Sequence, residues 1–436
     1  MSTHRSDDKR GGRRPPFSGS RPVRTHGADE SAAAVPRPAR LEAPAVELPP
    51  GVPAVHLKSI HFGTFFYEKM VGRVEGSPAD GELVAVADRV GKLFGWGFYN
   101  GRAAIRLRMF SRSPQRPDDS EIARRIAEAV RLRRDVLQLD RVTDACRLVH
   151  AEGDGLTGLV ADRLGPYVAI ELFGLAMYQR LGLIQDAFID AGLSVKNFVV
   201  RADKGVAEQE GIPLHRLRDP KVGPVVIQEH GVKFAVDLAK GHKTGFFCDQ
   251  RDNRLALARL AGGRRVLDVC CYTGGFALYA AVLGQAAEVM GVDLDEKALA
   301  IAERNAELNG VDVPFTHADA FDFLRQAVAE RRQWDVVVVD PSKFVPRRSL
   351  MEVGLRKYAD LNRLAAGVVA PGGVLLTCSC SGLVDQPTFV VTVARAARAA
   401  GRTLQVFALT GAAPDHPFQP DTPESQYLKA VWARVG

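Results

Sequence analysis

The sequence has few cysteines and no long apolar run. Its 436 residues contain six cysteines, Cys146, Cys248, Cys270, Cys271, Cys378 and Cys380. Six irregularly spaced cysteines are too few for a disulfide framework in a chain of this length. No stretch of about 18 consecutive apolar residues is present, and the N-terminus lacks the apolar core of a signal peptide. We therefore expect free thiols, a reducing cytoplasmic location and no membrane partner.

The sequence also lacks a strong charge bias outside its first residues. It has 58 Lys and Arg against 51 Asp and Glu, a formal charge of +7. Residues 1–40 contribute nine basic and four acidic side chains, or +5, so the other 396 residues carry about +2. The overall charge is therefore no argument for nucleic-acid binding. Apolar residues make up 46% and charged residues 25%, a balance typical of folded soluble domains.

Four segments differ in composition. Residues 1–53 hold nine of the 25 prolines, which predicts a disordered basic tail. Residues 54–116 alternate apolar and polar side chains around Asn100-Gly101, which predicts a hairpin within a small β-barrel. Residues 117–225 begin with a helical pattern at 120–139 and continue with strands, which predicts a central α/β domain.

Residues 226–436 alternate apolar strands with amphipathic helices, which predicts a doubly wound parallel sheet of the Rossmann-like class. The expected strands are 265–269, 288–293, 314–317, 334–340 and 373–378, and the expected helices lie near 275–283, 295–309, 320–330, 350–370 and 386–400. Ligands of such sheets bind outside the carboxyl ends of the strands, where the strand order reverses. We therefore search for a site at these strand ends.

Acidic residues stand at four successive strand ends, namely Asp268, Asp293, Asp319 and Asp340. The first strand also leads into a turn containing Gly274 and Gly275. A dinucleotide needs the spacing G-x-G-x-x-G, so that helix amides can meet a pyrophosphate, and this turn lacks it. S-adenosylmethionine has no phosphate and carries a cationic sulfonium, so carboxylates suit it better. A single strand-end Asp is often only a helix cap, but the four together predict S-adenosylmethionine as the cofactor.

Several segments together resemble the RlmI-like class of bacterial 23S ribosomal RNA cytosine-C5 methyltransferases. They are HKTGFFCDQRDNR (242–254), VLDVCCYTGGFALYAA (266–281), DPSKF (340–344), CSCSG (378–382) and DHPF…PESQYLKA (415–430). The resemblance covers about residues 55–436. It implies a PUA-like RNA-binding domain, a central α/β domain, a class I methyltransferase domain and a structured RNA substrate. The family usually has a second proline where this chain has Ser342.

The strand ends, the turn and this resemblance together give an expected donor site. Its residues are Gln250, Asp268, Tyr272, Thr273, Gly274, Gly275, Phe276, Asp293, Asp319 and Asp340. Thr244, Phe246, Phe247 and Gln250 look like the family's lid over the donor, although the two phenylalanines could equally pack in the core. Gln250 or Arg251 is expected to bind the methionine carboxylate.

Cys380 is the expected nucleophile. Cytosine C5 becomes nucleophilic only after a thiolate has added to C6, and Cys is the most nucleophilic of the common side chains. The resemblance places the catalytic cysteine in Ser379-Cys380-Ser381-Gly382. The alternative is a small buried apolar residue, the usual state of a free cysteine. No second ligand pair with zinc spacing accompanies Cys378 and Cys380, so no metal is expected.

Asp340 and several basic residues are expected to contact the RNA. Asp340 could accept a hydrogen bond from the cytosine N4 amine, donate one to N3 when protonated, or only cap its strand. Lys343 could contact a phosphate or the base. Arg102, Arg106 and Arg108 share one parity after Asn100-Gly101 and should face one side of a strand, toward phosphate or solvent.

The expected partner is large-subunit ribosomal RNA, and a homodimer is one expectation for the assembly. The target base must be unpaired or flipped, because a helix hides C5 and C6. Two other functions remain open. One is RNA N-methylation, in which Asp340-Pro341 would polarise an amine and no thiol is needed. The other is a ribosome assembly factor that binds the donor without turnover.

Overall fold

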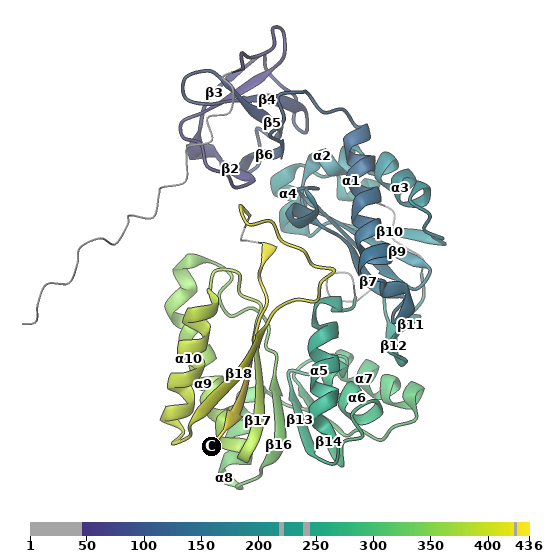
Figure 1. Cartoon of the computed structure of the whole chain (residues 1–436), viewed down its shortest axis with the longest axis vertical. Helices are drawn as coiled ribbons and strands as arrows, with labels where there is room; N and C mark the ends of the chain where they lie inside the picture. Colours follow the sequence, from purple (N-terminus) through teal and green to yellow (C-terminus); the bar gives the residue numbers. More distant parts are fainter. Residues whose placement is uncertain (1–45, 218–221, 239–244, 423–424) are drawn as a thin grey trace, which may run out of the picture. The chain divides into compact units, whose positions relative to one another are not determined.

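The computed structural model describes residues 46–217, 222–238, 245–422 and 425–436 (Figure 1). The predicted disorder of residues 1–45, and the lid residue Thr244, lie outside the described residues. Residues 46–53, which were predicted to belong to the tail, instead contact the first sheet. The Leu93 amide donates to the Val46 carbonyl at 2.8 Å, and the Ala85 amide donates to the Pro53 carbonyl at 3.0 Å.

The first folded segment is a six-stranded sheet in the order β2-β6-β5-β4-β1-β3 (Figure 1). Its strands are β1 (Ala54–Leu57), β2 (Phe65–Tyr67), β3 (Val71–Glu75), β4 (Leu83–Ala87), β5 (Leu93–Tyr99) and β6 (Ile105–Ser111). The antiparallel pair β5–β6 is joined across Asn100-Gly101, so the predicted hairpin is confirmed. Asn100 is buried, and its side-chain amide donates to the Glu210 carbonyl at 2.9 Å.

The next segment is a four-stranded sheet in the order β10-β9-β8-β7. Its elements are α1 (Ser120–Arg131), β7 (Ala145–His150), β8 (Leu159–Leu164), β9 (Tyr167–Leu172), α2 (Leu175–Gln179), α3 (Leu181–Asp190), β10 (Asn197–Arg201) and α4 (Lys204–Glu210). The α-helix α1 is shorter than the predicted 120–139, because a π-helical turn, Leu132–Val136, follows it. Its apolar stripe, which includes Ile122 and Ile126, is buried as the helical spacing predicted.

A two-stranded hairpin, β11 (Val225–Glu229) and β12 (Val232–Val236), precedes a seven-stranded sheet in the order β15-β14-β13-β16-β17-β19-β18 (Figure 1). The strands of that sheet are β13 (Arg265–Val269), β14 (Glu288–Asp293), β15 (Phe315–His317), β16 (Trp334–Val339), β17 (Val369–Ser379), β18 (Leu404–Thr410) and β19 (Lys429–Val435). Its helices are α5 (Arg251–Ala261), α6 (Gly275–Val282), α7 (Glu296–Asn309), α8 (Ala320–Ala329), α9 (Met351–Val368) and α10 (Gln386–Ala399).

Strands β13 to β17 are parallel, whereas β19 runs antiparallel to both of its neighbours. The predicted Rossmann-like class is thus confirmed, and the five predicted strands are parallel. The antiparallel strands β18 and β19 at the C-terminal edge were not predicted. The described residues between β18 and β19 contain no α-helix, and the two strands form an antiparallel pair rather than a right-handed crossover.

The central strands are buried on both faces. Val336 and Val338 pack in the core cluster on one face, and Val337 and Val339 pack in the cluster on the other. This division follows from the alternation of side chains along a strand. The chain leaves β13 toward β14 and β15 on one side, and returns to β16 and β17 on the other. The strand order therefore reverses between β13 and β16, the position where ligands bind in such sheets.

Candidate active site at the carboxyl edge of the sheet

The turn between β13 and α6 has a constrained backbone. Cys270 and Tyr272 have left-handed φ angles of 63° and 49°, which cost energy for residues other than glycine. Asp293, at the end of β14, holds this turn, because its Oδ2 accepts from the Tyr272 amide at 2.8 Å. Its Oδ1 accepts from the Asp295 amide at 2.8 Å. The predicted donor residues on β14 and in the turn are thus in direct contact.

Gly274 fits its place in the turn only as glycine. Its φ is +81°, and a Cβ there would lie 3.1 Å from the Phe315 ring and 3.3 Å from Ala302 Cβ. Asn305 on α7 fixes the preceding residue, because its side-chain amide donates to the Thr273 carbonyl at 3.0 Å. Sequence reasoning did not assign Asn305 to the site, since an Asn in a helix gives no local signal of such a contact.

Asp268 is buried behind this turn. Its Oδ2 accepts from the Ala277 amide at 3.0 Å, while Oδ1 has no hydrogen-bond partner among the described residues. Burial, together with the nearby Asp340 and Asp293, raises the pKa of Asp268 to about 8. A buried polar atom without a partner is costly, so a ligand that supplies one is stabilised. The strained turn and this unsatisfied oxygen fit a polar ligand such as S-adenosylmethionine.

Asp319 follows β15 at the same edge and caps α8. Its Oδ1 accepts from the amides of Phe321 at 2.8 Å and Asp322 at 3.2 Å. A carboxylate at a helix N-terminus is stabilising on its own. Asp319 is therefore a helix cap, which was the alternative considered for aspartates at strand ends. A role in donor binding stays a prediction.

Asp340 and Cys380 lie at the ends of the adjacent strands β16 and β17. The Gln250 side-chain amide donates to Asp340 Oδ2 at 2.9 Å, which brings two predicted residues together. Cys380 Sγ lies 3.9 Å from the carbonyl oxygen of Pro341. Cys380 is partly exposed, whereas Cys378 is fully buried and burial raises the pKa of its thiol well above the usual range. Of the two thiols, only Cys380 is accessible.

The phenylalanines before α5 have separate positions. Phe246 is buried, and the Arg254 guanidinium lies 4.9 Å from its ring centroid. The Phe247 ring meets the Tyr272 ring edge-on, with the centroids 5.2 Å apart. Phe246 therefore packs in the core, and Phe247 contacts the turn between β13 and α6.

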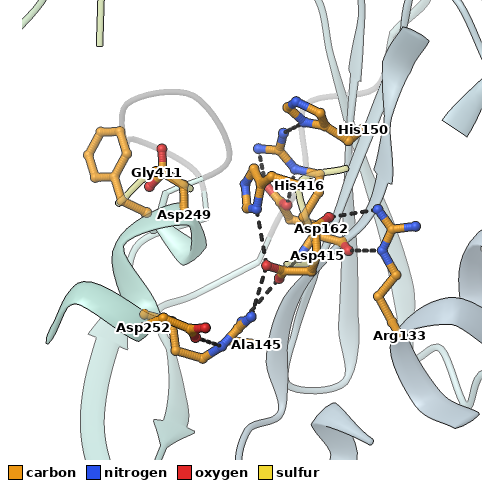
Figure 2. A network of polar contacts seen from close by, with 12 residues as sticks. Arg133, Ala145, His150, Asp162, Asp249, Asp252, Gly411, Asp415 and His416 are labelled. Atoms are coloured by element: carbon orange, nitrogen blue, oxygen red, sulfur yellow. Dashed lines mark hydrogen bonds and ion pairs between the residues drawn. The ribbon is translucent and has the colours of Figure 1, made fainter. Parts of the chain in front are cut away.

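Arg251, the alternative to Gln250 as a carboxylate ligand, is already paired. Its guanidinium donates to both oxygens of Asp415, at 3.0 and 2.8 Å, and both side chains are buried. Figure 2 shows Asp415 within this network of polar contacts. Asp415 also accepts from the Arg147 amide at 2.9 Å. The DHPF segment that contains Asp415 is thus an anchor for Arg251. Arg251 and Asp415 are far apart in the sequence, so the sequence alone did not predict this contact.

Of the three predicted arginines, Arg106 and Arg108 lie on β6, whereas Arg102 does not. Arg102 is exposed but lies in the turn, because β6 begins only at Ile105, so the parity prediction is wrong for Arg102. Arg106 pairs with Glu68 at 3.0 Å. Arg108 is buried and pairs with Glu210 at 2.8 Å, so it is structural. Lys343 is exposed beside Asp340-Pro341.

Two protein families match the chain. Residues 217–434 match the S-adenosylmethionine-dependent methyltransferases, and residues 62–112 match the PUA-like domain. Ribosomal RNA large subunit methyltransferase I of Aeromonas hydrophila is 38% identical over 380 residues, covering 85% of this chain and 95% of the relative. The protein of that name from Vibrio cholerae is 38% identical over 379 residues, covering 85% and 94%.

The chain belongs to the S-adenosylmethionine-dependent methyltransferase family. Its membership confirms S-adenosylmethionine as the predicted cofactor and a methyltransferase as the predicted class of enzyme. The match over residues 62–112 confirms that the first sheet belongs to a PUA-like domain. The fold agrees with solved structures. SMU.776 complexed with SAH has a TM-score of 0.73 at 19% identity and covers 89% of this chain and 100% of its own. A Streptococcus mutans structure has a TM-score of 0.74 at 19% identity, covering 88% and 100%.

None of the helices in the described residues of this methyltransferase combines the length and the apolar character needed to cross a bilayer. Within the same residues, no three His, Cys, Asp or Glu side chains gather where they could hold a metal ion.

Proposed function

We propose that this methyltransferase forms 5-methylcytosine in 23S ribosomal RNA through a covalent bond between Cys380 and cytosine C6. The observation that carries the proposal is the partly exposed Cys380 thiol, 3.9 Å from the Pro341 carbonyl. This thiol lies at the sheet edge that also holds the β13–α6 turn. The names of the relatives, which specify large-subunit ribosomal RNA, support the same substrate.

The donor site we propose consists of the strand-end residues and the turn. Asp293, Asp319 and the buried Asp268 offer carboxyl groups, Gly274 permits a close backbone approach, and Gln250 lies beside Asp340. The remaining members are Tyr272, Thr273, Gly275 and Phe276. Bound S-adenosylmethionine supplies an electrophilic methyl group on a sulfonium.

Cys380 supplies the nucleophile for the target base. Its thiolate attacks C6, a bond forms between Sγ and C6, and the electron pair of the C5–C6 double bond moves to C5. After methylation of C5, a base removes the C5 proton, the double bond re-forms and the Sγ–C6 bond breaks. The thiolate is thereby released unchanged. Asp340, held by Gln250, accepts from the cytosine N4 amine or, when protonated, donates to N3.

The proposal extends to the partners of the enzyme. Lys343, Arg102 and Arg106 contact the RNA backbone; Arg102 and Lys343 are exposed, and Arg106 pairs with a largely exposed glutamate, Glu68. The domains we propose are residues 54–116 for RNA binding, 117–225 as the central domain and 226–436 for catalysis. A cytoplasmic location and a homodimer complete the proposal.

Covalent capture tests the proposal. Ribosomal RNA with 5-fluorocytosine at the target should form a heat-stable, donor-dependent adduct with the enzyme, because fluorine cannot leave as a proton. Cys380→Ala should abolish this adduct, and Cys378→Ala should retain it as the matched control. Mass spectrometry of the nuclease-treated adduct identifies the attached residue.

Two outcomes would contradict the proposal. Methyl transfer that survives Cys380→Ala would favour RNA N-methylation. Donor binding without transfer to ribosomal RNA or to assembly intermediates would favour an assembly factor.

A further inference from the structure

Cys380 stands between two buried serines that fix its backbone. Ser379 Oγ donates to the Tyr358 hydroxyl at 3.0 Å, and the same hydroxyl lies 2.9 Å from Ser381 Oγ. Ser381 Oγ also accepts from the Val345 amide at 3.1 Å. The turn that carries the thiol is therefore joined to α9 and to the segment that follows Asp340-Pro341.

Lys429 anchors the same turn from β19. It lies opposite Ser379 in the antiparallel register, and only 5% of the residue is exposed. Its ammonium donates to the Ser381 carbonyl at 2.6 Å and to the Tyr427 carbonyl at 2.7 Å. No carboxylate forms an ion pair with Lys429 in the part of the chain that the structure describes. A buried ammonium without a counter-ion is costly, so a nearby negative charge is expected to offset it.

The charged groups near Lys429 indicate which negative charge offsets its ammonium. Burial lowers the pKa of Lys429 to about 8, an ionised Cys380 raises it, Lys343 lowers it and Asp385 raises it. Asp385 is exposed and caps α10 through the Thr388 amide at 2.7 Å. The Lys429 ammonium contacts the carbonyl of Ser381, the residue next to Cys380, whereas Asp385 is exposed, so the Cys380 thiolate is the negative charge that we expect to offset it.

Other titratable groups also lie near Cys380. An ionised Cys380 raises the pKa of the Tyr358 hydroxyl and of the buried Cys378 thiol, so both lie within its electrostatic reach. Asp340 precedes the Pro341 carbonyl that lies against Sγ. Lys429 and Lys343 are the cationic groups in this set. Because the attraction between two charges is mutual, a thiolate that favours the ammonium is favoured by it.

We propose that Lys429 is a positioning residue for Cys380, whose ammonium fixes the Ser379–Ser381 turn and stabilises the Cys380 thiolate. The role of that thiolate in methyl transfer rests on the proposed function. The electrostatic coupling itself does not, and it can be measured without RNA or donor.

The test is alkylation of Cys380 by iodoacetamide as a function of pH, with mass spectrometry of the peptide that contains Cys380. Lys429→Gln removes the charge but keeps a hydrogen-bond donor for the carbonyls. It should raise the pH midpoint of alkylation by about one unit and slow the reaction at pH 7 about tenfold. Lys429→Arg keeps the charge and should restore the midpoint. Lys233→Gln, an exposed lysine on β12, is the matched control and should change nothing.

A second variant separates anchoring from charge. Tyr358→Phe removes a neutral contact of the turn, so it should lower kcat while leaving the alkylation midpoint unchanged. If Lys429→Gln does not fold, Lys429→Met takes its place, because an uncharged apolar side chain suits a buried site. A folded, charge-free variant with the wild-type midpoint would overturn the inference. A shifted midpoint without any 5-fluorocytosine adduct in the wild type would instead contradict the proposed function.

Discussion

At the scale of single residues, Asp268 shows how burial and charge oppose each other. The residue is 1% exposed, and the pKa of its carboxyl group is raised to about 8 by burial and by the neighbouring Asp340 and Asp293. The folded chain therefore keeps a proton on Asp268 over a pH range in which the unfolded chain has lost it. A bound cation would favour the ionised form at the same position.

Asp268→Asn should flatten the pH dependence of stability. Between about pH 4 and pH 8 the folded state binds more protons at Asp268 than the unfolded state, so the free energy of unfolding falls as pH rises. Removal of the titrating group should reduce that fall by at least about 1 kcal/mol. Urea denaturation at pH 5 and pH 8 measures it. Asp322→Asn, an exposed carboxylate, is the control, and equal slopes in both variants would refute the prediction.

At the scale of elements, the β13–α6 turn combines a backbone requirement with a packing requirement. Gly274→Ala places a Cβ at φ +81° and 3.1 Å from the Phe315 ring. We expect a loss of about 2–3 kcal/mol in the free energy of unfolding, and weaker donor binding, because the turn must shift. Chemical denaturation and calorimetric titration with S-adenosylmethionine measure the two effects.

Gly310→Ala is the matched control for that turn. Gly310 ends α7 with φ +65°, and a Cβ there meets nothing within 4 Å. It should cost only about 1 kcal/mol and leave donor binding unchanged. Similar losses in the two variants would show that contact with Phe315 contributes nothing.

The elements differ in how well the sequence predicted them. Strands such as β13 and β14 match their predicted bounds, because apolar runs between amphipathic helices leave few alternatives. The antiparallel β18 and β19 were not predicted. The connection between them is long, and its described residues form neither a tight hairpin turn nor a crossover α-helix that would mark the pairing.

At the scale of the whole molecule, Asp415 joins distant segments. It accepts from Arg251 and from the Arg147 amide. His416 Nδ1 lies 3.1 Å from Asp415 (Figure 2). The Asp415 carbonyl accepts from buried Arg133 at 2.6 Å. Burial alone would raise the pKa of Asp415, but His416 and Arg251 outweigh it and hold the pKa far below the usual range.

Asp415→Ala should lower the free energy of unfolding by about 3–5 kcal/mol at pH 7, because it leaves the Arg251 charge buried and unpaired. The contribution of Asp415 is present above the unfolded pKa near 4 and is lost as pH falls toward the folded value. Thermal unfolding at pH 7 and at about pH 3, inside the range where the contribution is being lost, measures both effects. Asp252→Ala removes the exposed partner of Arg251 and should cost less than about 1 kcal/mol. Equal losses would contradict the assignment.

Local sequence patterns were enough to predict the alternation of strands and helices, the acidic strand ends, the glycine turn and a cysteine after β17. These features depend on periodicity and residue type, which can be read from neighbouring residues. The pairing of Arg108 with Glu210, of Arg251 with Asp415 and of Lys429 with the Cys380 turn emerges only in the folded chain. Each contact joins side chains far apart in the chain, and no local pattern specifies which distant partner a buried charge will find.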